Sequence, residues 1–79
     1  MRILNYSFKK RGNIDFIFDQ FPHSVVVFAP IKNYYFIRYV RWDERDPIVL
    51  RQDLAAMELE ANKHLNCFDW YKRRKAFGK

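Results

Sequence analysis

The apolar residues of this 79-residue chain change their spacing near residue 46, and this change constrains the fold more than any other feature. Up to residue 42, apolar and polar residues alternate in short runs, which is typical of strands that bury one face. From Leu50 to Phe68, apolar residues recur every three or four positions, which predicts a helix with one apolar stripe. The chain is therefore predicted to be α+β, with a sheet first and a helix after it.

Residues 1–42 contain four runs that are predicted to be strands. Two of them, residues 4–8 and 14–18, flank a KKRGN segment whose Gly and Asn favour a hairpin turn. After a loop, a short apolar strand is expected over residues 25–29. The last run, residues 34–42, is apolar on both faces and is expected to be a central or doubly covered strand.

Asp46 followed by Pro47 predicts the start of the helix. An Asp side chain caps free N–H groups, and the fixed φ of proline suits the first helical turn. No Gly or Pro interrupts the sequence from there to Gly78. A helix over residues 46–76 is therefore expected, either continuous or bent near residues 62–66.

The chain is predicted to form one domain over residues 1–79, with the sheet in residues 1–42. The predicted architecture is a three- or four-stranded, mostly antiparallel meander. A long C-terminal helix, continuous or bent, follows it and packs on one face of the sheet. Eight Phe, five Tyr and two Trp supply the large buried surface that so small a core requires.

The predicted helix is longer than the predicted sheet. From Pro47 to Lys75 it would extend about 43 Å, whereas strands of six or seven residues extend about 20–23 Å. Its last third is then expected to bend back, to pack on a second copy or to dock on another molecule. Leu59 and Trp70 strengthen this expectation because they project opposite to the apolar stripe. The alternative is that Trp70 lies flat on its own helix.

Basic residues are concentrated at the two ends of the sequence. Residues 1–13 and 72–79 contain Lys and Arg but no acid, whereas residues 14–71 contain all nine acids and have a negative net charge. The formal net charge of +6 therefore belongs to the two ends. This asymmetry suggests a polyanionic or acidic partner.

Interleaved aromatic and basic residues in the segment 70–77 predict contact with single-stranded nucleic acid, because cations neutralise phosphates and rings stack on bases. The alternative is that these cations only complement the end of a helix and keep a small protein soluble. The predicted nucleic-acid-binding residues are Lys9, Lys10, Arg11, Arg41, Lys72, Arg73, Arg74 and Lys75. The predicted stacking or partner-binding residues are Tyr39, Leu59, Phe68, Trp70 and Tyr71.

Tyr35, Tyr39 and Arg41 would form a stacking platform if one face of the sheet were open. This arrangement is similar in chemistry to the aromatic strands of RNA-recognition sheets. The chain lacks the helix between the first strands and the glycine-bearing aromatic motif of that family. The alternative is that these aromatic residues belong to the core.

The sequence contains few residues with catalytic potential. His64 and Cys67 are three residues apart on the predicted helix, a spacing that would suit a thiolate and its base or half of a metal site. No further ligand cluster accompanies them, and a small apolar role for Cys67 is the favoured alternative. No catalytic residue, metal or cofactor is predicted, although a metal-free small ribonuclease would leave no spacing signature.

The favoured function is that of a small, basic, non-enzymatic nucleic-acid-binding accessory protein. The alternative is a protein-binding inhibitor or adaptor of the kind found among phage-encoded proteins, monomeric or homodimeric, which docks its C-terminal helix on an acidic partner with an apolar groove. A cytoplasmic location without membrane contact is expected, because no apolar run approaches the length of a membrane span.

Overall fold

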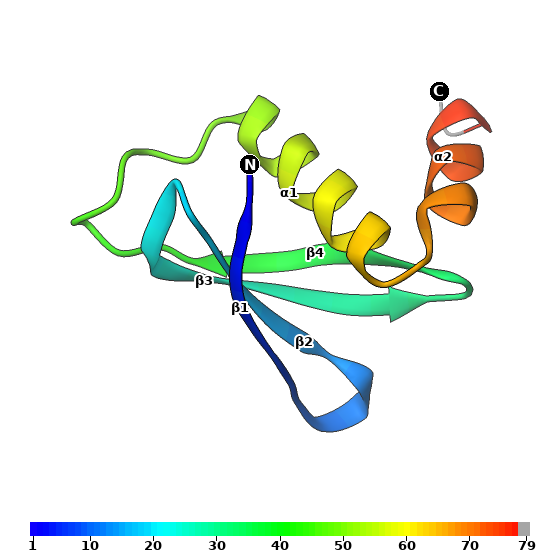
Figure 1. Ribbon diagram of the computed structural model, residues 1–79, viewed down its shortest axis with the longest axis horizontal. Coiled ribbons are helices and arrows are strands. Elements are labelled where there is room, and N and C mark those ends of the chain that lie inside the picture. The colour runs from blue at the N-terminus through cyan, green and yellow to red at the C-terminus, as the bar shows by residue number, and fades with distance from the viewer. Residues whose placement is uncertain (78–79) are drawn as a thin grey trace.

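The structure is a computed structural model that describes the backbone of residues 1–77 and the side chains of residues 1–73. Four strands form one antiparallel sheet in the order β1-β2-β3-β4, and two helices follow it (Figure 1). The predicted α+β class and antiparallel meander are confirmed. The elements are β1 (Ile3–Phe8), a short 3-10 turn η1 (Lys10–Gly12), β2 (Ile14–Phe18), β3 (Phe21–Ile31), β4 (Tyr34–Arg41), α1 (Arg51–His64) and α2 (Phe68–Phe77).

Phenylalanine rings form the centre of the core. Phe16 on β2 has its ring centroid 5.0 Å from that of Phe28 and 5.8 Å from that of Phe18. Met57 and Ala61 of α1 are fully buried against this cluster, as the apolar stripe predicts. Each buried aromatic ring removes a large apolar area from water, so a small number of buried side chains is enough to form the core of a chain of this length.

A β-bulge in β4 breaks the alternation that the sequence suggests. The register with β3 shifts so that Val27 lies opposite Tyr39 while Phe28 lies opposite Ile37. The extra residue, Arg38, allows Ile37 and Val40 both to pack against the core. Tyr39 consequently shares the face of Val27, away from the core cluster. The predicted grouping of Tyr35 with Tyr39 and Arg41 is wrong, because Tyr35 packs against the core.

β3 is longer than expected, running from Phe21 to Ile31 rather than over residues 25–29 alone. Pro30 fits into it because the pairing of β3 with β2 ends at Phe28, so the missing N–H of proline removes no bond of that ladder. β4 is an edge strand and not a central one. The expectation of a central strand is therefore wrong. One face of β4 packs against the core, and Tyr39 on its other face is 49% exposed.

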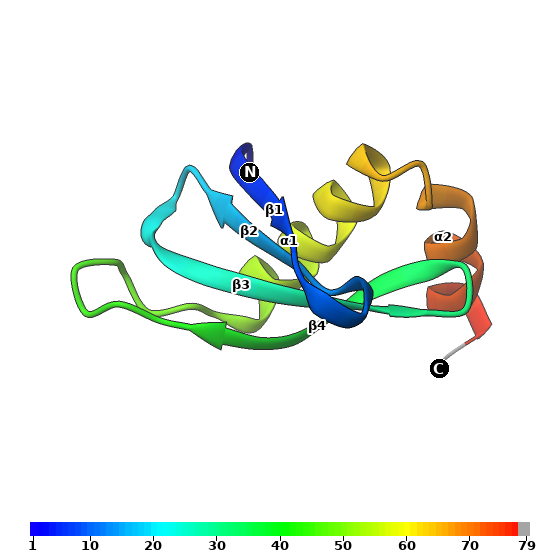
Figure 2. The same cartoon turned by 90° about the horizontal axis from the view of Figure 1, so that it is seen from below.

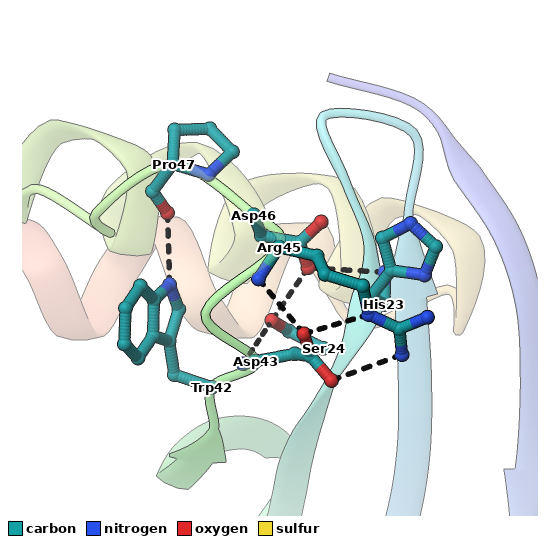
Figure 3. A network of polar contacts seen from close by, with 7 residues as sticks. All are labelled: His23, Ser24, Trp42, Asp43, Arg45, Asp46 and Pro47. Atoms are coloured by element: carbon teal, nitrogen blue, oxygen red, sulfur yellow. Dashed lines mark hydrogen bonds and ion pairs between the residues drawn. The ribbon is translucent and has the colours of Figure 1, made fainter.

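Asp46 does not cap a helix at Pro47, contrary to expectation. Its side chain is 5% exposed, and its Oδ2 accepts hydrogen bonds from the Ser24 hydroxyl at 2.6 Å and from the His23 backbone N–H at 3.0 Å (Figure 3). Because the Asp46 carboxylate is hydrogen-bonded to residues near the start of β3, it does not accept the N–H groups of a following helical turn. Residues 42–50 therefore form a loop instead of a first turn.

α1 begins at Arg51, with Leu50 as its N-cap. The Leu50 N–H donates to Oδ2 of Asp53 at 2.9 Å, which is the backward half of a capping box. The loop before it is held by the indole of Trp42, whose Nε1 donates to the carbonyl of Pro47 at 2.9 Å (Figure 3). The capping bond of Leu50 and the Trp42–Pro47 hydrogen bond in the preceding loop thus set the start of α1.

α1 ends at His64 in a Schellman motif. Asn66 has a φ of 60° in the left-handed region, which Asn tolerates better than most residues. The Cys67 N–H donates to the Asn62 carbonyl at 2.7 Å, and the Asn66 N–H donates to the Lys63 carbonyl at 3.2 Å. These bonds satisfy carbonyls at the helix end and reverse the chain direction.

The prediction of one long helix that extends beyond the sheet is wrong, and the bent alternative describes the chain. α1 has 14 residues, about 21 Å at 1.5 Å per residue, which does not exceed the eight-residue strand β4 beneath it. α2 instead turns back at the end of the sheet, beside the β3–β4 hairpin (Figure 1). The ring of its Tyr71 lies 6.2 Å from that of Tyr34.

Side chains of α1 close part of the free edge of β4. The buried Asn62 accepts the Tyr35 N–H at its Oδ1 (2.8 Å) and donates from its Nδ2 to the Tyr35 carbonyl (2.9 Å). Glu58 accepts the Ile37 N–H at 3.1 Å. These side chains replace a fifth strand along this stretch, so backbone groups that an edge leaves unpaired are satisfied.

Candidate nucleic-acid interface

The connections of the meander place seven of the twelve Lys and Arg side chains that the structure describes at one end of the molecule. Because the strands are antiparallel, the β1–β2 turn, the β3–β4 turn and the C-terminal end of α1 lie at the same end, where α2 also packs (Figure 2). The opposite end has the β2–β3 turn and the loop before α1, with Asp19, Asp43, Glu44 and Asp46. The cations at the first end include Lys9, Lys10, Arg11, Lys32, Lys63, Lys72 and Arg73.

Cations and aromatic rings come into contact where α1 meets α2. We call Lys63, Phe68, Trp70, Lys72 and Arg73 the cationic corner. The Nζ atoms of Lys63 and Lys72 lie 5.5 Å and 5.9 Å from the centroid of the half-buried Phe68 ring. The guanidinium of Arg73 lies 4.9 Å from the ring of Trp70, which is 47% exposed. These are distances at which a ring quadrupole attracts a cation.

The cations of the corner are not neutralised by ion pairs within the described part of the chain. Among side chains of residues 1–73, the ion pairs are Arg41 with Asp15 and Arg45 with Asp43. Asp69 is the acid nearest in sequence, and it lies in the first turn of α2, where it complements the helix dipole. A hollow of about 220 Å³ beside Phe68 is lined by Lys63, Asn66, Phe68 and Asp69. Within the described residues, the cations of the corner therefore have no ion-pair partner, and Asp69 is the acid that lines the same hollow as Lys63.

Tyr71 is placed differently from its predicted stacking role. It is 6% exposed, and its hydroxyl donates to Oε1 of Glu58 at 3.2 Å. Burial, followed by the nearby Glu58 carboxylate, raises the pKa of Tyr71 far above its ordinary value. The ring anchors α2 to α1 and β4, so it is not accessible to a base.

The other predicted residues lie apart from the corner. Lys9, Lys10 and Arg11 are exposed in the β1–β2 turn, which points away from α2 in Figure 1. Leu59 is half-buried on α1. The side chains of Arg74 and Lys75, which belong to α2, lie outside the described residues.

Tyr39 and Arg41 lie on the sheet face opposite the core. Tyr39 is 49% exposed, and it pairs across the strands with Val27. The Arg41 guanidinium reaches across β3 to Asp15, with 3.3 Å between Nη2 and Oδ2. A phosphate at Arg41 would have to compete with that carboxylate, whereas the cations of the corner have no such ion pair among the described residues.

A polar network that sequence reasoning missed joins His23, Ser24, Asp43 and Asp46 at the opposite end (Figure 3). The Ser24 hydroxyl donates to Asp46 and accepts the Asp43 N–H at 2.9 Å. Ser24 is fully buried, so its Oγ has no access to a substrate, and the network serves to hold the loop before α1. No spacing in the sequence signals it, because its members come from separate segments.

Asp43 also binds the guanidinium of Arg45 through both carboxylate oxygens, at 3.0 Å and 3.1 Å (Figure 3). This side-chain hydrogen bonding lowers the pKa of Asp43 to about 2. Both side chains are substantially exposed, so the pair contributes little to stability.

His64 and Cys67 are held by separate contacts. The His64 ring packs edge-on against Tyr6, with 4.7 Å between ring centroids, whereas the Cys67 thiol donates to the Leu65 carbonyl at 3.4 Å. Burial raises the pKa of the Cys67 thiol, which lowers the fraction of thiolate at neutral pH. Within the described residues, no three His, Cys, Asp or Glu side chains gather in a metal-binding arrangement.

The structure is a small α+β fold, in which α1 covers one face of a four-stranded antiparallel meander and α2 lies at the cationic end of the sheet. Residues 2–76 match the family described as Uncharacterised protein YuzH, and the chain belongs to this family. No curated protein and no solved structure matches the chain. Neither helix of the described chain has the length and apolar character that crossing a membrane requires.

Proposed function

We propose that this protein binds single-stranded nucleic acid through the cationic corner, as a non-enzymatic accessory protein. The observation that carries the proposal is the contact of Arg73 with the exposed Trp70, beside the two lysines at Phe68. Such a surface offers charge for phosphates and a ring for a base within one helical turn. Phe68 is partly covered, so Trp70 is assigned the stacking role.

An acidic protein surface is the alternative partner for the same cations. The protein-docking interpretation depended on an overshooting helix with Leu59 and Trp70 on a free apolar face. α2 folds back instead, and Tyr71 is buried against α1. An exposed ring with a cation stacked on it suits bases and phosphates better than an apolar groove.

The test is fluorescence anisotropy with labelled oligothymidylate and oligouridylate over a range of salt concentrations. Trp70→Ala is expected to weaken binding by about 5- to 150-fold, the equivalent of about 1–3 kcal/mol for one stacked base. Lys72→Ala is expected to reduce the slope of log K against log salt by about 0.7, the value for one phosphate contact on a single strand.

The matched control is Arg51→Ala, which removes one exposed cation from the start of α1, away from the corner. It is expected to leave both the affinity and the salt slope nearly unchanged. If Arg51→Ala weakens binding as much as Lys72→Ala, attraction to net charge explains the binding and the corner has no special role. Lack of binding at about 100 µM protein in low salt, the weak limit of nonspecific affinities, would overturn the proposal and favour the acidic protein surface.

A further inference from the structure

A hollow of about 430 Å³ lies between β4 and the first two turns of α1. Its volume falls in the range of ligand pockets and is about twice that of the hollow at the cationic corner. The residues that line it come from two elements: Ile37, Arg38, Tyr39 and Val40 from β4, and Arg51, Leu54, Ala55 and Glu58 from α1. We call this hollow the β4–α1 groove.

Within the described contacts, α1 bonds the edge of β4 at two positions, and the groove begins beyond them. Asn62 bonds the backbone of Tyr35, and Glu58, four residues earlier, bonds that of Ile37. Four helix residues and two strand residues both advance about 6–7 Å, so one more step brings residues 54–55 opposite the next part of β4. These are a leucine and an alanine, which have no polar side-chain atom to bond a strand edge. The edge is therefore left uncovered there.

The β-bulge of β4 lies in the same place. Its extra residue is Arg38, between Ile37 and Tyr39. A bulge interrupts regular pairing along an edge and re-aims a side chain. The groove therefore does not favour the addition of another strand, and the exposed Arg38 lines it instead. Recognition at this groove has to come from side-chain contacts.

Apolar side chains form much of the walls of the groove. Leu54 and Val40 are half-buried and pack against the core, whereas Ala55 is exposed and has only a methyl group. Apolar surface continues just before α1, where Leu50 is 52% exposed and Ile48 is 73% exposed. Exposed apolar surface that extends over neighbouring residues is typical of protein interaction sites. A protein segment is long enough to cover both parts, whereas a small molecule would leave the loop residues exposed.

Two arginines supply positive charge from the two elements of the groove. Arg38 belongs to β4 and Arg51 to α1, and neither forms an ion pair among the described residues. The acid in the lining is Glu58, whose carboxylate oxygens accept the Ile37 N–H at 3.1 Å and the Tyr71 hydroxyl at 3.2 Å. Arg51 lies seven residues before Glu58, about 10 Å along the helix axis. That separation is about one screening length at physiological salt, so an anion at Arg51 is only weakly repelled by Glu58.

Other acids near the start of α1 are placed elsewhere. Asp53 accepts the Leu50 N–H at 2.9 Å, and residues two apart on a helix do not face each other. Asp43 and Glu44 belong to the loop whose turn extends away from α1 in both views (Figures 1 and 2), and Asp43 is already ion-paired. The charge that the groove presents around Arg51 is therefore positive.

We propose that the β4–α1 groove binds a segment of another protein in which acidic residues flank apolar ones. A carboxylate matches the planar fork of an arginine guanidinium through two parallel hydrogen bonds, and aliphatic side chains match the walls. Phosphates of a nucleic acid favour surfaces without carboxylates, whereas the groove includes Glu58 between apolar residues. The groove is separate from the cationic corner, so this proposal is independent of nucleic-acid binding.

The probe is a fluorescein-labelled, acetylated and amidated peptide of about eight residues, with glutamates at both ends of a leucine and valine centre. Fluorescence anisotropy is expected to show weak binding, with a dissociation constant of about 1 mM or lower, because the contact is small. A peptide with glutamine in place of each glutamate is expected to bind at least about 5-fold more weakly, because it keeps the apolar groups and loses the charge. Equal binding of the two peptides, or no binding up to about 1 mM, would overturn the proposal.

Variants locate the contact. Ala55→Trp fills the groove and is expected to weaken peptide binding at least about 10-fold, whereas the matched control Gln52→Trp adds the same ring to an exposed residue of α1 outside the lining and leaves it unchanged. Arg51→Ala is expected to weaken binding about 5-fold, and Lys72→Ala, at the corner, to leave it unchanged. If Lys72→Ala weakens the peptide as much as Arg51→Ala, attraction to net charge explains the binding and the groove is not the site.

Amide chemical shifts of the unmodified protein give a test that needs no variant. Titration with the glutamate peptide is expected to shift residues 37–40 and 51–58 and to leave residues 68–73 unchanged. Oligothymidylate is expected to leave residues 37–40 unchanged. Peptide-induced shifts confined to α2, or shifts of the groove residues by oligothymidylate, would refute the assignment of the groove to an acidic protein segment.

Discussion

Replacement of Asn62 by alanine tests whether α1 completes the sheet edge at β4. Asn62 is fully buried and makes three hydrogen bonds, two with the backbone of Tyr35 and one from its Nδ2 to the Glu58 carbonyl at 2.8 Å. Alanine removes all three. The N–H and the carbonyl of Tyr35 are then left without these partners under the helix.

The expected loss of stability follows from the two backbone groups of Tyr35. A buried donor or acceptor that loses its partner costs about 1–3 kcal/mol, so two of them predict a loss of about 2–6 kcal/mol. A chain of this length is expected to have a total unfolding free energy of about 4–12 kcal/mol. Asn62→Ala is therefore expected to lose a large share of that stability. At a urea m-value of about 1 kcal/mol/M, the unfolding midpoint would fall by about 2–6 M.

The assay is urea unfolding followed by far-UV circular dichroism and by tryptophan fluorescence. The control is Gln52→Ala, which removes an exposed amide from the same helix and is expected to change stability by less than about 0.5 kcal/mol. If Asn62→Ala loses less than about 1 kcal/mol, Tyr35 has found other partners and the closure of this edge by Asn62 is refuted.

Three further outcomes are expected. Burial raises the folded-state pKa of Tyr71 above its unfolded value of about 10. The resulting stability is fully present below about pH 10 and falls by up to about 1.4 kcal/mol per pH unit above it. In unfolding measurements at alkaline pH, Tyr71→Phe should reduce that fall. Ser24→Ala removes the 2.6 Å donor to the buried Asp46 and is expected to cost about 1–3 kcal/mol by calorimetry. Gly12→Ala places a Cβ 3.2 Å from Cγ of Pro30 at a φ of +78° and is expected to cost about 1–2 kcal/mol by thermal melting. An unchanged melting temperature would show that this position does not require glycine.

The elements that local pattern determines were predictable from the sequence. The alternation in residues 14–18 places Phe16 and Phe18 in the core, and the helical stripe places Met57 and Ala61 there. The bend near residue 66 was also predictable, because Asn is one of the few residues that tolerate the left-handed conformation. In each case the signal lies within a few residues of the structure it determines.

Features that depend on distant partners were not predictable. The role of Asp46 changes because Ser24 and the His23 N–H reach it from another strand, and no local rule contains that contact. The bulge at Arg38 shifts the alternation of β4 by one residue. The residues after Arg38 therefore face the opposite side of the sheet from the one that a strict period of two predicts.

The same limit applies to the candidate site. Trp70, Lys72 and Arg73 were predicted because basic and aromatic residues are interleaved in residues 70–77. Lys63 was missed because its contact with Phe68 crosses the turn between α1 and α2, where helical spacing no longer applies. Tyr71 was misassigned because its burial depends on Glu58, thirteen residues earlier.

The cationic corner and the β1–β2 turn are separate cationic surfaces. α2 packs against α1 and β4, whereas the turn with Lys9, Lys10 and Arg11 points away from α2 (Figure 1). Salt weakens phosphate contacts at either surface, because screening acts on all exposed cations. Among the described contacts, cations lie over aromatic rings at the corner. Lys72, rather than Lys10, is therefore the residue whose replacement tests the combination of charge and stacking that the proposed function requires.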